Sequence, residues 1–342
     1  MATISVCLIV KDEEAVLGRC LDCLLPVADE IVVVDTGSSD RTKEVAANYT
    51  DKIYDFVWIS DFAAARNFAF SKTKMDYIYS ADADEVLTKQ EQEKFLRLKQ
   101  ALLPEIEIVQ MVYVNPKDCN MAYNYTKELR PKLFKRLREF RWIDPIHETV
   151  ALTPLVYDSD IEILHLPQSN HAGRDFAAME RVLAKDGTMS ARLYSMYAKE
   201  LYISGEQEDF FRAEPYFRAR AAAPQTLPEE KLEALCILAK AAALRKNTKE
   251  LFALCLAELA GSRNLPAELA FLLGEALEEE QKEEAALEWY KKAAFEAENY
   301  VCLSYGGTEA LRQVIRLCQK LGREEAVQYE AYWKELKESG QA

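Results

Sequence analysis

Residues 30–46 read EIVVVDTGSSDRTKEVA, a β-branched apolar run that passes through one aspartate into a polar segment. The Ser, Thr and Asp residues after the run are types that cap the N-termini of helices. A strand at residues 30–34, followed at once by a helix at residues 38–48, is the repeating unit of parallel sheets. The stretch therefore predicts a strand–helix unit with Asp35 at the carboxyl end of its strand.

The same alternation continues on both sides of this stretch. We expect strands at residues 4–10, 52–57 and 77–81, and helices at residues 13–25 and 62–72. Strands and helices that alternate over short connections predict a doubly wound, mostly parallel α/β sheet, Rossmann-like in its layers. Ligands of such sheets bind beyond the carboxyl ends of the strands.

The pattern becomes mixed from about residue 111. Strand-like pieces at residues 111–114, 132–134 and 161–166 predict the second part of the sheet and a lobe that faces the acceptor. After about residue 170 the chain is rich in Ala, Leu, Glu and Lys, and strand-like runs stop. We therefore expect an α/β domain at residues 1–172 and an all-α domain at residues 173–342.

The helical half contains a weak repeat. Tyr216, Cys255 and Tyr290 occupy similar positions at separations of 39 and 35 residues, near the period of roughly 34 residues of tetratricopeptide helix pairs. The segment AELAFLLGEAL at residues 267–277 fits a first helix of such a pair. Helix hairpins are expected, and a tetratricopeptide-like array is favoured over a generic helical bundle. Such arrays present a concave face to a peptide or a protein partner.

Composition excludes several classes of protein. The net charge of −14 argues against a protein that binds nucleic acid by broad neutralisation of phosphates. The apolar run near the N-terminus is too short for a membrane span and lacks the features of a signal peptide. We therefore expect a cytoplasmic protein with reduced thiols, no nucleic-acid partner and no membrane span.

Eight cysteines are scattered along the chain. The C-x-x-C pair of Cys20 and Cys23 has no second pair that would complete a zinc site. A structural position on the helix after the first strand is favoured over a redox role for both residues.

Polar clusters follow three of the expected strands: Lys11-Asp12-Glu13, Asp35-Thr36-Gly37 and Asp82-Ala83-Asp84. Residues two apart on an extended segment point the same way, so Asp82 and Asp84 can converge. Converging carboxylates disfavour each other's ionisation unless a cation lies between them. Mg²⁺ and Mn²⁺ are typically held by one or two carboxylates together with substrate phosphates and water. The D-x-D therefore favours a metal site over a solvated loop.

Three segments together resemble the family 2 glycosyltransferases with a GT-A fold: SVCLIVKDEEAVLGRCLDCL at residues 5–24, the stretch quoted first, and FAAARNFAFSKTKMDYIYSADADEVL at residues 62–87. The resemblance is dense over residues 3–90. It continues more loosely through RPKLFKRLREFRWIDPIHETV to IEILHLP, which ends at residue 167. Members with tetratricopeptide-like tails are familiar in bacteria.

The resemblance implies the residues that hold the nucleotide. Val10, Lys11 and Glu13 match the end of the first strand, where the family grips the nucleotide. Asp35 matches an aspartate that hydrogen-bonds the base, and Arg66 matches an arginine that approaches the diphosphate.

Each of these assignments has a structural alternative. Asp35 could belong only to a capped turn, and Arg66 could be a surface arginine that pairs with Asp61. A basic run is most simply the solvated face of a strand, with phosphate or anionic acceptor contact as the alternative: Lys132, Lys135, Arg136, Arg138 and Arg141.

The resemblance also implies the metal ligands. Asp82 lies nearer the ribose and Asp84 on the metal in the family's D-x-D, and His165 matches a histidine that closes the catalytic domain. We expect Asp84, Asp82 and His165 to hold Mn²⁺ or Mg²⁺. His165 stands between Leu164 and Leu166, so a core histidine is its alternative.

The general base comes from the acceptor side. His147-Glu148 resembles an H-E dipeptide of related sequences, and a polar loop is the alternative. Transfer to an acceptor hydroxyl or thiol needs a base, normally a carboxylate in an inverting enzyme. We expect Glu148 to be that base, with Asp144 as the second candidate. Trp142 could stack on a sugar face or pack in the core.

Together these implications describe one activity. The resemblance implies a metal-dependent, inverting glycosyltransferase that moves a sugar from a nucleoside-diphosphate sugar, with a UDP-sugar favoured. Its acceptor would be a peptide, a protein or an envelope glycan, held by the helical half. The alternative is a non-catalytic helical-repeat scaffold that carries an inactive transferase domain. Damage to the D-x-D or to the nucleotide positions would mark that scaffold, and none is visible.

Overall fold

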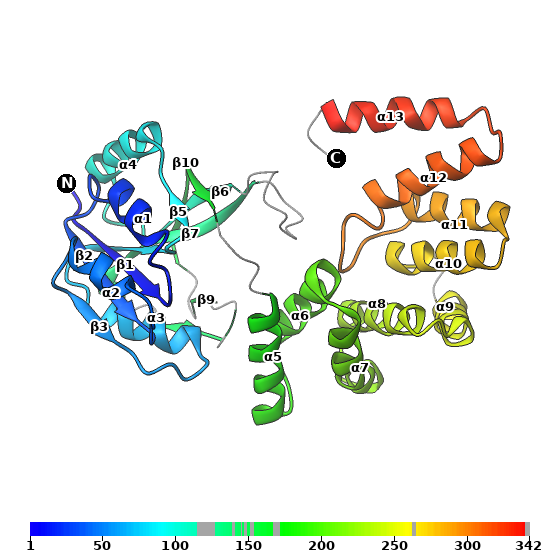
Figure 1. The fold of residues 1–342 in the computed structure, drawn as a ribbon, viewed down its shortest axis with the longest axis horizontal. Helices are drawn as coiled ribbons and strands as arrows, with labels where there is room; N and C mark the ends of the chain where they lie inside the picture. Colours follow the sequence, from blue (N-terminus) through cyan, green and yellow to red (C-terminus); the bar gives the residue numbers. More distant parts are fainter. Residues whose placement is uncertain are drawn as a thin grey trace. The chain divides into compact units, whose positions relative to one another are not determined.

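The computed structural model describes residues 1–114, 127–138, 141–144, 146, 149–150, 154–166, 172–261 and 265–338. The chain divides into two compact units, Met1–Val182 and Leu183–Ala342 (Figure 1). Helix α5 (Ala172–Asp186) contains this division. The predicted boundary between residues 172 and 173 lies at the start of α5 and stays a prediction.

The first unit is built on one large sheet with the strand order β3-β2-β1-β4-β7-β6-β10-β5. Strands β3, β2, β1 and β4 are parallel, β7 lies antiparallel between β4 and β6, β10 is parallel to β6, and β5 is antiparallel to β10. The strands of this sheet are β1 (Ile4–Val10), β2 (Glu30–Asp35), β3 (Ile53–Asp55), β4 (Tyr77–Ala81), β5 (Glu85–Val86), β6 (Ile108–Val114), β7 (Lys127–Lys135) and β10 (Val156–His165).

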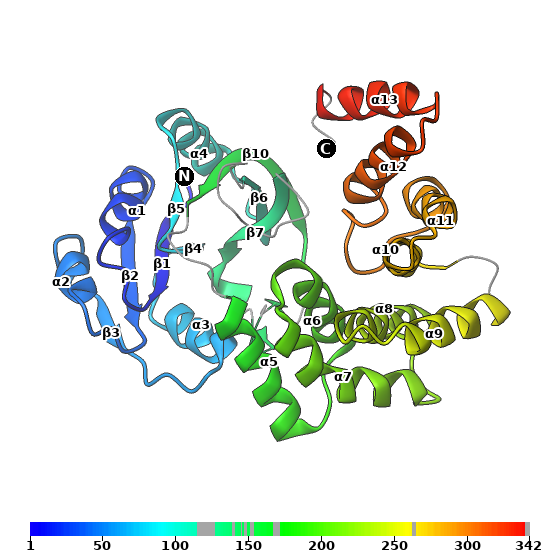
Figure 2. The same ribbon diagram turned by 45° about the vertical axis from the view of Figure 1, so that its right-hand side comes forward.

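Helices cover both faces of this sheet (Figure 2). One core cluster joins the sheet to α1 (Leu17–Leu24), α2 (Thr42–Ala47) and α4 (Lys89–Ala101). A second cluster on the other face joins it to α3 (Phe62–Ser71) and to a two-stranded sheet of β8 (Trp142–Ile143) and β9 (Thr149–Val150). A short 3₁₀ turn, η1 (Arg136–Arg138), follows β7. The predicted α/β class, a mostly parallel GT-A-like sheet, is confirmed.

The register of the central strands explains where a site can form. Val10 pairs with Asp35 across β1 and β2, and Leu8 pairs with Ala81 across β1 and β4. Every residue of β2 is buried, which accounts for its continuous apolar run. Because the three strands are parallel, their carboxyl ends lie at one edge of the sheet, and the predicted polar clusters meet there.

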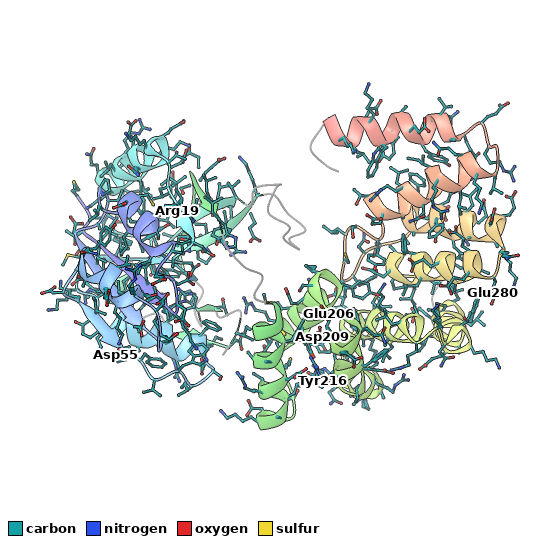
Figure 3. All side chains as sticks on the ribbon, in the orientation of Figure 1. Arg19, Asp55, Glu206, Asp209, Tyr216 and Glu280 are labelled. Atoms are coloured by element: carbon teal, nitrogen blue, oxygen red, sulfur yellow. The ribbon has the colours of Figure 1, made fainter. Side chains whose placement is uncertain are left out.

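The second unit is all helical. Helices that follow one another along the chain pack together, as α7 does on α8, α10 on α11 and α11 on α12. The helices are α6 (Ala191–Ser204), α7 (Gln207–Ala222), α8 (Pro228–Leu244), α9 (Thr248–Gly261), α10 (Ala267–Glu279), α11 (Glu283–Phe295), α12 (Thr308–Lys320) and α13 (Ala326–Glu338). A capping box of Glu206 and Asp209 starts α7, and Tyr216 lies further along it (Figure 3).

The repeat predicted from the sequence coincides with the helix hairpins. Tyr216, Cys255 and Tyr290 lie on α7, α9 and α11, the later helix of each successive pair. A Cβ atom built on Gly274 of α10 would lie 2.7 Å from the Tyr290 ring. The glycine of the LLG sequence thus allows the two helices of that pair to approach closely. These features fit the tetratricopeptide-like prediction.

A longer connection joins α11 and α12, and one carboxylate organises it. Glu268 is fully buried. Its Oε1 atom accepts hydrogen bonds from the backbone N–H groups of Tyr300, Val301 and Cys302 at 3.0, 2.8 and 2.9 Å. Three donors satisfy a charge that would otherwise be costly to bury.

In the described part of the chain, no helix combines the length and the apolar character that a bilayer crossing requires.

Candidate active site

The loops after β1 and β2 are joined by hydrogen bonds. The Asp12 N–H donates to Ser38 Oγ at 2.9 Å, and the Glu13 N–H donates to Thr42 Oγ1 at 2.7 Å. In the other direction, the Ser39 N–H donates to the Asp12 carboxylate at 2.6 Å. Asp12 has a φ of 54°, a left-handed conformation that Asp tolerates better than most residues. The two loops therefore form one rigid rim at the edge of the sheet.

The predicted nucleotide positions lie along this rim. Val10 is buried, and its carbonyl accepts the Thr36 N–H at 2.9 Å. Lys11 is exposed and Glu13 is partly exposed. The structure thus brings Val10, Lys11 and Glu13 next to Asp35, the end of the neighbouring strand.

Asp35 uses one carboxylate oxygen in the fold. Its Oδ1 atom accepts the Gly37 and Ser38 N–H groups at 2.9 and 3.0 Å, so the capped turn of the alternative interpretation is present. Its Oδ2 atom is buried and has no hydrogen-bond partner among the described residues. An acceptor left without a partner is costly, and a ligand N–H group would satisfy it. A nucleobase carries such N–H groups.

Arg66 projects from α3 toward the end of β4. Its Nη2 atom lies 3.6 Å from Asp82 Oδ1, its Nη1 atom donates to Ser80 Oγ, and its guanidinium lies 4.9 Å from the centre of the Trp142 ring. The side chain is only 12% exposed, so the interpretation as a surface arginine is wrong. Asp61 instead caps α3 by accepting the Ala64 N–H at 2.9 Å.

Residues 82–85, which we call the acidic segment, are held by buried charge of the opposite sign. Lys132 of β7 places its Nζ atom 2.5 Å from Glu85 Oε1 and 3.4 Å from Asp82 Oδ2. Lys132 is only 5% exposed, so the expected solvated strand face is wrong for this residue. A cation of the protein itself therefore holds two of the three acids together.

The pKa values of Asp82 and Glu85 in the acidic segment shift in opposite directions. Burial raises the pKa of Glu85 to about 8, although Lys132 opposes the shift. Partial burial also acts to raise the pKa of Asp82, but Lys132 and Arg66 outweigh it and hold that pKa well below its usual range. Asp82 therefore keeps its negative charge, and its two cationic neighbours already compensate that charge.

Asp84 faces a different partner. Its Oδ2 atom lies 3.2 Å from His165 Nε2, and its carbonyl accepts the Leu166 N–H at 3.0 Å. The His165 ring packs against Tyr113 with 5.0 Å between ring centres. His165 is thus buried like a core histidine and also aimed at the carboxylate of Asp84.

These residues fit a divalent cation only in part. No group of three or more His, Cys, Asp or Glu side chains with metal-binding geometry occurs among the described residues. Asp84 and His165 offer one oxygen and one nitrogen ligand, and Asp82 is paired with two cations. Mg²⁺ and Mn²⁺ commonly take few protein ligands and complete their shell with phosphate and water. The donor set therefore fits a metal that binds together with a diphosphate.

The acceptor side is described in part. His147 and Glu148 lie outside the described residues, so the assignment of the base stays a prediction. Asp144 follows β8 and has a φ of 66°. Trp142 is buried against Phe70 and Phe134, which favours core packing over stacking on a sugar.

Two of these side chains were not predicted as part of the site. The sequence pattern favours a solvated basic run for Lys132 and indicates no role for Glu85. The signal for Lys132 is the pairing of Leu133 with Tyr79 across β7 and β4. Only this antiparallel register brings Lys132 to the end of β4.

Cys20 and Cys23 lie in the core beneath the acidic segment. Cys20 Sγ donates to the Asp82 carbonyl at 3.3 Å, and Cys23 Sγ accepts the Leu87 N–H at 3.2 Å. Burial raises the pKa of both thiols. Neither thiol is activated, and the structural interpretation of the C-x-x-C pair holds.

Acidic and basic side chains that gather at the carboxyl edge of a mainly parallel sheet are typical of nucleotide-binding α/β domains. Comparison with known families defines the domain further. The sequence model described as Glycosyl transferase family 2 matches residues 5–154. This part of the chain is a family 2 glycosyltransferase domain, as the resemblance predicted.

Several known proteins are similar to the chain. A TPR repeat-containing protein of Synechococcus elongatus is 34% identical over 44% of this chain and 36% of its own length. The lipopolysaccharide core biosynthesis glycosyltransferase LpsC of Rhizobium meliloti is 33% identical over 36% of this chain and 46% of its own length. The match thus spans less than half of either relative.

A solved structure also aligns with the chain. It is glucosyl-3-phosphoglycerate synthase from Mycobacterium tuberculosis, in complex with Mn²⁺, uridine diphosphate and glucosyl-3-phosphoglycerate. The alignment has 14% identity and a TM-score of 0.39 over 56% of this chain and 82% of that chain.

Proposed function

We propose that the protein is a metal-dependent, inverting glycosyltransferase that takes its sugar from a nucleoside-diphosphate sugar, with a UDP-sugar favoured. One observation carries the proposal. At the end of β4, Asp84 faces His165 while Asp82 is compensated by Arg66 and Lys132. The site thereby combines a place for a metal cation with the positive charge of Arg66 for a diphosphate. The family 2 domain at residues 5–154 supports the same activity.

The residues of the site would have separate roles in binding and catalysis. Asp35 would accept a hydrogen bond from the base through its unpartnered Oδ2 atom, and Val10, Lys11 and Glu13 would line the nucleotide along the rim. Arg66 would stabilise the charge that develops on the diphosphate leaving group.

The metal ligands and the general base have the remaining roles. Asp84 and His165, with Asp82 as a further oxygen donor, would hold Mn²⁺ or Mg²⁺, which supplies Lewis-acid stabilisation of the leaving group. Glu148, or Asp144 as second candidate, would take the proton of the attacking acceptor group. Inversion of the anomeric carbon follows from a single displacement by that acceptor.

The acceptor is proposed to be a peptide, a protein or an envelope glycan, and the helical unit is proposed to hold it. The name of LpsC refers to lipopolysaccharide core biosynthesis, which supports a glycan acceptor. Helix pairs that stack in tetratricopeptide fashion bind peptides on a concave face, which supports a peptide or a protein. A cytoplasmic location is proposed as well.

The first prediction tests the donor site. We expect one nucleoside diphosphate to raise the melting temperature in the presence of Mn²⁺ or Mg²⁺ and to lose this effect in a chelator. A ligand at about a hundred times its Kd adds about 2.7 kcal/mol of stability, which is roughly a few degrees for a domain of this size. Asp84→Asn should abolish the metal-dependent part of the shift, because it removes a charged ligand.

Asp160→Asn is the matched control for this measurement. Asp160 pairs with Lys94 and its side chain is 84% exposed, so the variant should respond to nucleotide as wild type does. If no nucleotide shifts the melting temperature with any metal, the transferase proposal fails and the scaffold interpretation takes its place.

A further inference from the structure

Lys132, the cation that pairs with the acidic segment, has no role in the proposed transfer itself. Lys132 belongs to β7, and its Nζ atom reaches past the end of β4 toward residues 82–85. Lysine is rarely buried in proteins unless it is paired, and Lys132 is 5% exposed. The groups that its ammonium contacts therefore indicate what Lys132 holds in place.

Lys132 contacts the acids on both sides of Asp84. Its ammonium lies 2.5 Å from Glu85 Oε1 and 3.4 Å from Asp82 Oδ2. Glu85 is only 2% exposed, so this pair is shielded from water and its geometry is fixed. The chain on either side of Asp84 is therefore tied to one point on β7.

The remaining side of Asp84 is tied to β10. Its carbonyl accepts the Leu166 N–H at 3.0 Å, and Glu85 pairs with His165 across β5 and β10. Asp84 thus has a fixed backbone, with its carboxylate directed to His165 Nε2 at 3.2 Å. Asp84 and His165 therefore take their places next to an acidic segment that Lys132 ties to β7.

We propose that Lys132 is a positioning residue for the metal. It bridges Asp82 and Glu85 and so presents Asp84, together with His165, to the cation. Lys132 itself binds neither metal nor substrate in this arrangement. Without Lys132, the bridge from β7 to Asp82 and Glu85 is lost, and the carboxylate of Asp84 loses its fixed direction. The inference rests on the proposed metal-dependent function.

The test uses the full chain and Mn²⁺ as the probe. Free Mn²⁺ is measured by electron paramagnetic resonance, first with protein alone and then with UDP. We expect Lys132→Met to raise the Kd for Mn²⁺ by about 10- to 100-fold, as is usual when a residue that orients metal ligands is removed. Lys132→Arg keeps the charge and should restore most of the affinity.

Two further variants separate positioning from folding. Leu133→Ala removes a fully buried neighbour on the same strand without a change of charge, and it should keep the wild-type Kd for Mn²⁺. The double variant K132M/E85Q leaves no uncompensated charge from the pair, so it should fold even where Lys132→Met does not. It should still bind Mn²⁺ about tenfold more weakly.

The measured Kd values for Mn²⁺ test the role of Lys132 directly. A wild-type Kd in Lys132→Met or in the double variant would overturn the inference, as would an equal loss of affinity in Leu133→Ala. A wild-type protein that binds Mn²⁺ but ignores UDP would contradict the proposed donor, and the Mn²⁺ comparison would still test Lys132. A wild-type protein with no affinity for Mn²⁺ under either condition would overturn both proposals.

Discussion

At Gly274 of α10, the absence of a Cβ atom allows α11 to pack closely. The Tyr290 ring occupies the space where a Cβ atom would lie, at 2.7 Å from it. Gly274→Ala raises helix propensity by about 1 kcal/mol, but the overpacking it creates costs typically about 1–3 kcal/mol. Tyr290 is only 1% exposed and has little room to yield. We therefore expect a net loss of stability, measured by urea unfolding.

Gly261→Ala is the control for that substitution. Gly261 ends α9 and has nothing within 4 Å of an added Cβ atom. The same measurement should show no loss of stability, or a small gain. Equal destabilisation by both variants would show that the Tyr290 contact is not the cause.

At the scale of single residues, the local sequence pattern predicts the positions of Asp82 and Asp84 but not that of their partner, Lys132. Asp82 and Asp84 follow an apolar strand directly, so their place at a strand end could be predicted from a few neighbours. Lys132 lies 50 residues from Asp82 along the chain. Its meeting with Glu85 depends on the antiparallel register of β7, which no local pattern encodes.

At the scale of elements, Glu30 of β2 joins β1 to the connections that precede β3 and β4. It is 4% exposed. Its carboxylate accepts hydrogen bonds from the Ser5 hydroxyl of β1, from Lys52 Nζ at 2.6 Å, and from the Lys74 N–H at 2.8 Å. Burial alone would raise the pKa of Glu30, but the hydrogen bonds from Lys52, Ser5 and Lys74 outweigh it and lower that pKa.

This lowered pKa predicts how stability depends on pH. The contribution of Glu30 is complete above its unfolded pKa near 4.5 and is lost as the pH falls through its folded pKa. Glu30→Gln should cost about 1–3 kcal/mol at neutral pH, because it removes a buried hydrogen-bonded charge. The difference from wild type should shrink below about pH 4.5, as measured by urea unfolding across the pH range.

Glu162→Gln provides the comparison for this experiment. Glu162 forms a surface pair with Lys127 in which the two side chains are 37% and 54% exposed. Surface pairs are worth about 0–1 kcal/mol, so this variant should change little at any pH. If the loss of stability in Glu30→Gln relative to wild type were no larger at neutral pH than at low pH, the assignment would be contradicted.

Elements joined by short connections could be predicted, and elements paired at long range could not. The strand–helix units of β1 to β4 and the hairpins of the second unit follow from periodicity within short windows. Strand pieces were expected near β6, β7 and β10, but their order in the sheet was not. That order is set by pairing across long loops, such as Val156 with Ile108.

At the scale of the whole molecule, donor binding should be confined to the first unit. With Mn²⁺ and the nucleotide that shifts the melting temperature, we expect slower amide hydrogen exchange at residues 11–14, 36–42 and 82–85. The amides of α10 and α11 should exchange at unchanged rates, because every proposed donor contact lies in the first unit. Protection of α10 and α11 alone would place the ligand in the helical unit and contradict the proposed site.

The thiol beneath the acidic segment has a chemical consequence. Oxidants and alkylating agents react with the thiolate form of cysteine, and Cys20 is fully buried with a raised pKa. Its Sγ atom donates a hydrogen bond to the Asp82 carbonyl at 3.3 Å. Damage at Cys20 therefore requires that the segment carrying Asp82 first lift away from the core. An intact site therefore protects Cys20 from oxidation, and oxidative inactivation at Cys20 would follow the opening of the fold.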